Sequence, residues 1–368
     1  MKKWGYLILC TVVMLFAGVI YAWSILKAPL AEEFQFSSTI LSVNYTLTFC
    51  FFCAGGVING KIRNAISLRN RMLLAAIMIL AGFFLASRMQ SAFLLYVGYG
   101  IIGGFGIGLL YSNIISEMTL WFRERQGLCS GVLMMGFGAS AMLLGNLLQR
   151  WMNMPEIGWR GTYLLLGILI GAAAIAAALV IKPLKADKST DSEHTEISAI
   201  QIPPGKMLKT VSFWAIFLRS ICTGCSGSVI INFSLELGLD IGASLAAATA
   251  VVGILSVCNG LGRLLFGFFF DLLGYKRTVW ISNVLSLSGI VLNILSYQYS
   301  SVEIFVVGAL ITGLAYGSMP TISSAIVADF YGTKYFTQNF SIMNFTLVAS
   351  SFLVIASSLL LDHFQGYM

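Results

Sequence analysis

The hydrophobic residues of this chain gather into long continuous runs that are separated by short polar links. The hydrocarbon core of a bilayer is about 30 Å thick, and a helix needs about 20 apolar residues to cross it. Runs of that length predict membrane-spanning helices and argue against a β-barrel, whose strands alternate polar and apolar residues. Eleven runs qualify, at approximately residues 5–28, 38–60, 72–88, 92–119, 126–149, 161–181, 211–234, 245–270, 278–297, 302–327 and 340–361.

One link is much longer than the others and divides the chain. Residues 182–209 are polar and charged, and they include Pro203 and Pro204. We therefore expect an N-terminal bundle of six helices over residues 1–181 and a cytoplasmic linker over residues 182–209. A C-terminal bundle would follow over residues 210–368, with five helices present.

The composition agrees with this pattern. Hydrophobic residues make up 58% of the 368 residues and charged residues 10%, against roughly 45–50% and 25% in an ordinary soluble domain. A disordered chain is excluded, because disorder requires low hydrophobicity and high charge. The sequence therefore predicts an all-α polytopic protein embedded in a lipid bilayer.

The basic residues lie mostly on one side of the predicted spans. With a cytoplasmic N-terminus, sixteen of the 22 Lys and Arg fall on the cytoplasmic side, and Arg219 and Arg263 lie within spans. This positive-inside bias predicts a multi-pass protein of the cell membrane, with a bacterial inner membrane favoured and the N-terminus cytoplasmic. It accounts for the formal net charge of +7 without a nucleic-acid partner, and we expect a monomer. Four residues remain for the outer side: Lys27, Arg88, Arg150 and Arg160.

The two halves of the chain repeat each other weakly. A shift of about 210 residues places Trp4 on Trp214 and the segment 56–60 near 267–271. Parallel six-helix repeats that flank a site at the midplane are a known transporter plan. The same shift places the start of a twelfth helix just past Met368. We therefore expect a final helix to be missing, and the alternative is a genuine eleven-helix protein.

Residues that carry enzyme chemistry are sparse. Two CxxC pairs, at 50–53 and 222–225, lie in apolar runs, and neither His194 nor His363 is near them. We interpret the seven cysteines as packing residues and predict no metal and no cofactor. An embedded enzyme would need a nucleophile–base pair or a metal cluster, and the chain has no ATP-binding loop of the GxxxxGK[ST] type. These observations favour a transporter over an enzyme.

The most specific local motif lies between the eighth and ninth predicted spans. It reads Asn259-Gly260-Leu261-Gly262-Arg263, and then Gly267-x-x-x-Asp271-x-x-Gly274-x-Lys276-Arg277. Glycines let helix backbones approach closely. Asp271 ends a helix beside two cations, an arrangement that can latch neighbouring helices in one access state and release them in the other.

This motif resembles the cytoplasmic loop signature of the major facilitator superfamily. The resemblance implies a fold of two pseudo-symmetric six-helix bundles, here with the twelfth helix missing, and gating roles for Gly267, Asp271, Gly274, Lys276 and Arg277. The first-half copy of the motif keeps Gly56, whereas Asn59-Gly60 stand where the acid is expected. We therefore expect a weaker latch in the first half.

Further stretches narrow the resemblance. They are the segments 18–24, 103–111, 121–127, 136–138, 213–214, 259–263, 316–320 and 328–334. Taken in this order along nearly the whole chain, these segments resemble the oxalate:formate antiporter family, which is related to the monocarboxylate transporters.

The resemblance implies alternating-access transport of small organic anions. In that family an arginine of helix 8 and a lysine of helix 11 neutralise carboxylates inside an aromatic cage. Arg263 matches the arginine, and Tyr21, Tyr111 and Tyr316 fall at or near cage positions. Leu347 stands about where the lysine is expected. The resemblance therefore favours monocarboxylates over oxalate.

The residues support part of this by themselves. A charge at the bilayer centre costs roughly 2.5–3.5 kcal/mol, and the planar fork of Arg suits a carboxylate. Asn259 lies four residues before Arg263, on the same helical face. Substrate contact and snorkelling to the interface are both open for Arg263. Arg219 could be a second anion contact, could pair with Glu117 or could reach the headgroups. Trp23 lies near Tyr21 and is a further candidate for the cavity lining.

Glu117 is the carboxylate that lies well inside a first-half span. Proton coupling and a salt bridge at the gate are both open for it, since burial raises the pKa of a carboxylate.

We therefore expect a secondary transporter of small monocarboxylates, such as formate, lactate or pyruvate, by proton symport or anion exchange. A membrane-embedded enzyme is less favoured. A truncated or decayed carrier that is inactive or acts as a sensor is the main alternative.

Overall fold

The computed structural model describes residues 2–36, 38–182, 201–352 and 356. Within these residues the chain forms helices and connecting loops, and no strand. Helices satisfy all backbone hydrogen bonds within one segment, as lipid requires. The all-α polytopic class that the apolar runs predict is confirmed.

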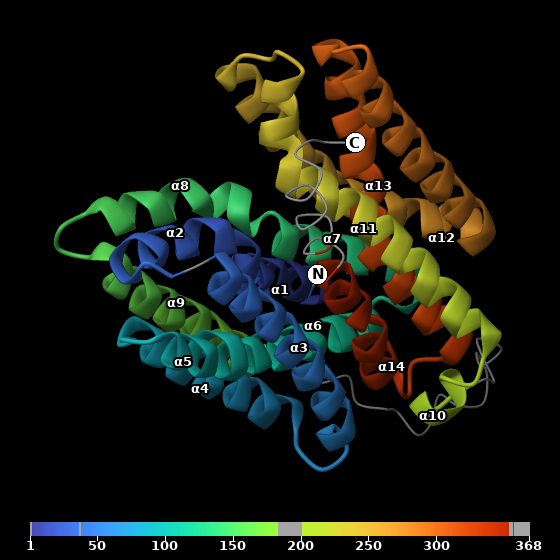
Figure 1. The fold of residues 1–368 in the computed structure, drawn as a ribbon. Coiled ribbons are helices and arrows are strands. Elements are labelled where there is room, and N and C mark those ends of the chain that lie inside the picture. The colour runs from blue at the N-terminus through green and yellow to red at the C-terminus, as the bar shows by residue number, and fades with distance from the viewer. Residues whose placement is uncertain (1, 37, 183–200, 353–355, 357–368) are drawn as a thin grey trace. The chain divides into compact units, whose positions relative to one another are not determined.

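The helices before the linker correspond to the first six predicted spans (Figure 1). A 3-10 segment, η1, interrupts the first span, and a π-helix, η2, interrupts the fourth. The elements are α1 (Lys2–Ala17), η1 (Gly18–Ala22), α2 (Trp23–Phe34), α3 (Ser38–Ile62), α4 (Leu68–Ser87), α5 (Ala92–Leu95), η2 (Tyr96–Gly103), α6 (Gly104–Trp121), η3 (Arg123–Arg125), α7 (Gln126–Gly138), α8 (Ser140–Asn153) and α9 (Gly158–Val180).

The second half of the chain begins with a short helix in the linker. The elements are α10 (Pro204–Met207), α11 (Val211–Asp240), α12 (Leu245–Gln298), α13 (Val302–Tyr331) and α14 (Phe336–Met343).

Nine helical segments among the described residues are long and apolar enough to cross a membrane. One of them, Ala246–Gln298, contains two predicted spans, 245–270 and 278–297. Gly274, with φ 73° and ψ 172°, breaks the helix between them. The last predicted span, 340–361, begins within α14, and its residues 353–355 and 357–361 lie outside the described part of the chain.

The contacts divide the chain into two compact units. Unit 1 comprises Met1–Glu124, Gly136–Thr210 and Ile326–Phe345. Unit 2 comprises Arg125–Met135, Val211–Ala325 and Thr346–Met368. Most of α7 therefore belongs to unit 2, and α14 with the end of α13 belongs to unit 1. The division into bundles at 1–181 and 210–368 stays a prediction, because units defined by contacts are not a test of it.

Small residues bring the helices of each unit close together. In unit 1, a Cβ atom on Gly108 of α6 would lie 2.0 Å from the carbonyl oxygen of Phe52 on α3. In unit 2, a Cβ atom on Gly262 of α12 would lie 2.3 Å from the carbonyl oxygen of Leu314 on α13. Such contacts are typical of membrane helices, which associate by close packing because lipid is as apolar as their side chains.

Candidate functional site

Arg263 lies in the first part of α12 with only 3% of its surface exposed. Its Nη1 donates to the carbonyl oxygen of Met134 on α7 at 2.7 Å. Its Nε donates to Oδ1 of Asn259 at 3.4 Å, so the two residues share a helical face as their spacing predicts. One nitrogen of the guanidinium thus donates to a buried carbonyl group in this structure.

Three helices of unit 2 converge at this arginine. A Cβ atom on Gly131 of α7 would lie 2.6 Å from the carbonyl oxygen of Arg263. A Cβ atom on Gly317 of α13 would lie 2.2 Å from the carbonyl oxygen of Asn259. Because neither glycine has a side chain, α7 and α13 both approach the backbone of α12 at the Asn259–Arg263 segment.

Tyr316 of α13 precedes Gly317 and faces α11. Its hydroxyl accepts a hydrogen bond from Ser228 Oγ at 3.4 Å, and its ring fills the space that a side chain at Gly227 would need. The structure therefore places Tyr316 on a helix that adjoins Asn259 and Arg263.

Arg219 of α11 is bound to the second part of α12. Its Nε donates to Asn283 Oδ1 at 2.9 Å, and its Nη2 donates to the hydroxyl of Ser282. These contacts satisfy part of the guanidinium with neutral groups. Its role as a second anion contact stays a prediction.

Tyr21 and Tyr111 share one aromatic cluster in unit 1. Both rings contact Phe137, with centroid distances of 5.5 Å for Tyr21 and 4.9 Å for Tyr111. Tyr111 also stacks on Phe340 of α14 at 6.2 Å. Phe137 and Phe340 are not among the predicted site residues, although the motif at 136–138 is a signal for the first.

Trp23 lies in a different cluster. Its ring contacts Tyr99 of η2 at 5.0 Å, and 5% of its surface is exposed. Tyr99 in turn contacts Phe83 and Tyr163. The structure thus does not bring Trp23 into the Tyr21–Tyr111 cluster, and its role in binding stays a prediction.

The gating motif meets the first turn of α7 within unit 2. The carboxylate of Asp271 accepts hydrogen bonds from the main-chain N–H groups of Gly127 at 2.9 Å and Leu128 at 2.7 Å. A carboxylate at this place complements the partial positive charge of a helix N-terminus. Lys276 and Arg277 are exposed after the break at Gly274. The structure therefore shows which helix Asp271 contacts, namely α7, which the sequence does not show.

Close backbone packing accompanies this cap. A Cβ atom on Gly267 would lie 2.3 Å from the carbonyl oxygen of Gly127, and one on Gly127 would lie 2.4 Å from that of Gly267. The two glycines let α12 and α7 touch backbone to backbone one turn from Asp271. This geometry suits a latch that opens when the two helices separate.

Glu117 of α6 lies in unit 1 with 6% of its surface exposed. It attracts two arginines electrostatically, Arg63 after α3 and Arg71 of α4. Arg63 lies outside the membrane-crossing segment, and burial lowers the pKa of its guanidinium while Glu117 opposes that shift. Gate and coupling roles for Glu117 both stay predictions.

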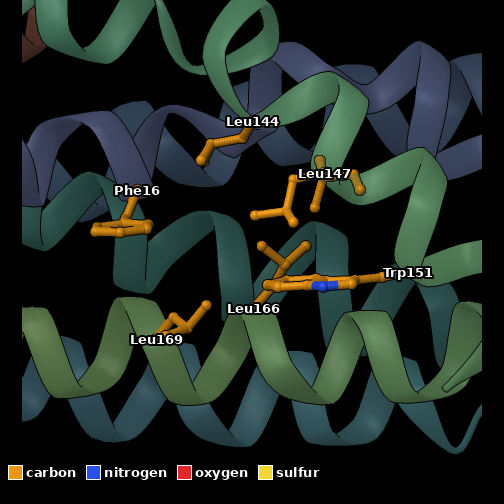
Figure 2. Close-up of a pocket in the computed structure, with 7 residues that line it drawn as sticks. Phe16, Leu144, Leu147, Trp151, Leu166 and Leu169 are labelled. Atoms are coloured by element: carbon orange, nitrogen blue, oxygen red, sulfur yellow. The ribbon is translucent and has the colours of Figure 1, made fainter.

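The pocket between α1, α8 and α9 does not provide an anion site. The pocket in Figure 2 lies between α1, α8 and α9, and its lining is apolar. Within the described residues, no group of three or more His, Cys, Asp or Glu could hold a metal ion. The lining residues of the pocket are Phe16, Leu144, Leu147, Leu148, Trp151, Leu166 and Leu169.

Comparisons with known proteins agree with this architecture. The chain is 22% identical over 341 residues to the oxalate:formate antiporter of Oxalobacter formigenes, and the match covers 92% of this chain and 80% of the relative. It is 24% identical over 235 residues to monocarboxylate transporter 12 of Xenopus laevis, and the match covers 58% of this chain and 50% of the relative. The solved structure of the proton:xylose symporter XylE has a TM-score of 0.72 and 15% identity, and the match covers 99% of this chain and 91% of that chain.

The comparison with protein families covers both halves of the chain. The sequence model of the Major Facilitator Superfamily matches residues 7–235 and 220–367. The transporter class and the family expected from the loop motif are therefore confirmed. The chain belongs to the Major Facilitator Superfamily and is a multi-pass membrane transporter.

Proposed function

We propose that this chain is a secondary transporter of small organic anions, with monocarboxylates such as formate, lactate or pyruvate as substrates. The observation that carries the proposal is the burial of Arg263 within an apolar span, beside Asn259. Arginine offers a planar, permanently charged fork that binds a carboxylate with two hydrogen bonds. A buried cation of this kind in a membrane span usually marks a substrate or ion pathway.

The names of two relatives support the same substrate class. One is an oxalate:formate antiporter and the other a monocarboxylate transporter. Leu347, at the place where a second cation is expected in that family, favours substrates with one carboxylate over oxalate. In this proposal Asn259 and Tyr316 donate neutral hydrogen bonds beside Arg263. Tyr21 and Tyr111 are further candidates for substrate contact, as their match to cage positions of that family implies.

Uptake into proteoliposomes tests the proposal. We expect saturable uptake of at least one of radiolabelled formate, lactate and pyruvate, with weaker uptake of oxalate. Arg263→Gln should lower kcat/KM at least about 30-fold, because truncating one partner of a buried charge pair costs roughly 2–5 kcal/mol. Arg263→Lys keeps the charge without the fork and should retain part of the activity. Arg150→Gln removes an exposed arginine of α8 and should leave uptake unchanged.

Two results would contradict the proposal. One is unchanged uptake in a folded Arg263→Gln variant. The other is the absence of uptake of all four anions by the parent chain under conditions in which the oxalate:formate antiporter is active.

The driving force is either a proton gradient or a counter-anion. An inside-alkaline gradient should accelerate uptake by a symporter, whereas internal unlabelled anion should accelerate uptake by an exchanger. Glu117→Gln separates the two roles open for this residue. Loss of the pH response with intact counterflow means coupling, and loss of both means a gate.

The distribution of basic residues also indicates where the protein lies and how it is oriented. We place the protein in a bacterial inner membrane as a monomer, with the N-terminus in the cytoplasm. Sixteen of the 22 Lys and Arg fall on the same side of the predicted spans as the N-terminus, and this bias supports the orientation. Labelling of Lys2 and Lys3 by an impermeant amine reagent in right-side-out vesicles should fail until the vesicles are opened.

A further inference from the structure

Each unit contains a helix N-terminus at an equivalent place, and the groups that contact it differ between the units. In unit 2 the first turn of α7 receives the carboxylate of Asp271 from α12. In unit 1 the corresponding helix is α14, which packs against α3 (Figure 1). The internal repeat places Gly60 of α3 at the position of Asp271.

The contact between α3 and α14 agrees with this correspondence. A Cβ atom on Gly60 would lie 2.2 Å from Cγ of Gln338, in the first turn of α14. α3 thus brings a glycine, without a carboxylate, to the place where α12 brings Asp271. The N-cap residue of α14, Tyr335, makes no capping hydrogen bond with its side chain. Within that turn the N–H of Phe336 donates to the carbonyl oxygen of Thr333 at 3.4 Å. The other first-turn N–H groups of a helix point outward and carry partial positive charge.

Two arginines add positive charge at the same place. Arg63 Nη1 donates to Thr337 Oγ1 in the first turn of α14 at 3.4 Å. Arg71 Nη1 donates to Asn59 Oδ1 at 2.9 Å, and the two guanidiniums are close enough to repel each other. Both are attracted to a single carboxylate, that of Glu117. Two cations and one anion leave an excess of one positive charge beside the positive end of a helix.

One donor of this cluster lacks an acceptor. Arg71 has 3% of its surface exposed, and its Nε is buried without a hydrogen-bond partner in the described structure. A buried charged donor without a partner is costly, and native proteins usually supply an acceptor. Arg63 is only half-buried, so the cluster remains open to an approaching group.

We propose that this end of unit 1 binds an oxyanion beside the first turn of α14, in the role that the Asp271 carboxylate has in unit 2. The ligand is a phosphate or carboxylate group that Arg63, Arg71 and the first-turn N–H groups of α14 hold together. Its source is either the headgroup of an anionic phospholipid or a free anion. Binding would fix α14 on α3 and so stabilise the state in which these helices touch. This site is separate from the one around Arg263, and its test does not depend on transport.

Thermal unfolding of the purified full chain in neutral detergent is the first measurement. At constant ionic strength, inorganic phosphate should raise the Tm saturably by a few degrees if free anions bind. Nanodiscs with phosphatidylglycerol in place of phosphatidylcholine should produce the shift if headgroups bind. Arg63→Gln should abolish whichever response occurs. Arg69→Gln, which removes an exposed arginine of the same region, should keep it.

A variant that carries its own carboxylate gives a sharper test. Gly60→Asp with Gln338→Gly copies the Asp271–Gly127 pair of unit 2 and should no longer respond to phosphate or phosphatidylglycerol. Gly60→Asn with Gln338→Gly has the same shape without the charge and should still respond. If the double variants do not fold, the comparison of Arg63→Gln with Arg69→Gln decides alone. The proposal is wrong if neither probe shifts the Tm of the parent, or if Arg63→Gln responds as the parent does.

Discussion

Asp271 caps α7 through Gly127, whose N–H donates to the Asp271 carboxylate at 2.9 Å. The two residues are 144 positions apart in the sequence. Asp271 belongs to the loop motif of the second half, whereas Gly127 follows the fourth predicted span of the first half. A cap of this kind gives the motif a physical role, since one carboxylate and two N–H groups join elements from both halves of the chain within unit 2.

Neutralising Asp271 should loosen the first turn of α7. Asp271→Asn keeps the shape but replaces one acceptor oxygen with a donor, and the charge–dipole attraction that it removes is worth about 0.3–1 kcal/mol for an exposed group. We expect hydrogen–deuterium exchange at Gly127 and Leu128 to accelerate by up to about five-fold. Asp329→Asn, which neutralises a carboxylate of unit 1, should leave these amides unchanged. Equal protection in Asp271→Asn and the parent would show that the cap is not stabilising.

The backbone contact beside the cap should be more sensitive than the cap itself. Gly267→Ala places a methyl group 2.3 Å from the carbonyl oxygen of Gly127, and a backbone atom cannot swing aside. Overpacking of this kind costs about 1–3 kcal/mol. We expect a lower Tm for the detergent-solubilised protein and faster exchange in the first turn of α7.

Gly253→Ala is the matched control for that change. It lies in the same helix, and a Cβ atom there meets nothing within 4 Å. Because alanine favours a helix over glycine by about 0.8–1 kcal/mol, this variant should be as stable as the parent or slightly more stable. A similar loss of Tm in both variants would rule out the contact with Gly127 as the cause.

The fold could be predicted largely from apolar run lengths, because the thickness of a bilayer sets the length of every spanning helix. The pairing of Asn259 with Arg263 could be predicted for a similar reason, since residues four apart share a helical face. That two predicted spans follow each other directly across Gly274 could not be predicted, because hydropathy does not show that the backbone turns there without a loop.

Contacts between segments far apart in the sequence could not be predicted from the pattern of hydrophobic and polar residues. That α7 packs on Gly267, and that α14 packs on Gly60, depends on tertiary geometry rather than on any local signal. The separation of Trp23 from Tyr21 has a simpler cause. Residues two apart on a helix lie on different faces, so the two rings have different neighbours.

A buried polar contact between α12 and α13 allows a quantitative test in unit 2. Asn293 Nδ2 donates to Thr312 Oγ1 at 3.0 Å, and both residues are buried. A double-mutant cycle with Asn293→Ala and Thr312→Val should give a coupling free energy of unfolding of about 0.6–1.7 kcal/mol, the range found between membrane helices. Thr278→Val is the control, because Thr278 bonds to Gly274 instead and its effect should add to that of Asn293→Ala. Additivity in both cycles would contradict the expected coupling.

Tyr316 can be displaced without being mutated, through the glycine against which its ring packs. A Cβ atom on Gly227 of α11 would lie 2.4 Å from Cδ2 and Cγ of Tyr316, so Gly227→Ala must move the ring. If Tyr316 lines the substrate site, this shift should raise KM for the transported anion roughly ten-fold, since misplacing a positioning group by about 1 Å can cost up to 10²-fold.

Gly224→Ala provides the comparison one turn away on α11. Its added methyl group would meet Ser350 Oγ at 2.6 Å, so it strains the same helix without touching Tyr316. We expect both variants to lose thermal stability, but only Gly227→Ala to change KM. Tyr316→Phe removes the hydroxyl that accepts a long hydrogen bond from Ser228 at 3.4 Å but keeps the ring, and it should change KM less than Gly227→Ala does. Equal KM values in the Gly227→Ala and Gly224→Ala variants would remove Tyr316 from the binding site, because the ring cannot keep its position once a methyl group occupies the space beside it.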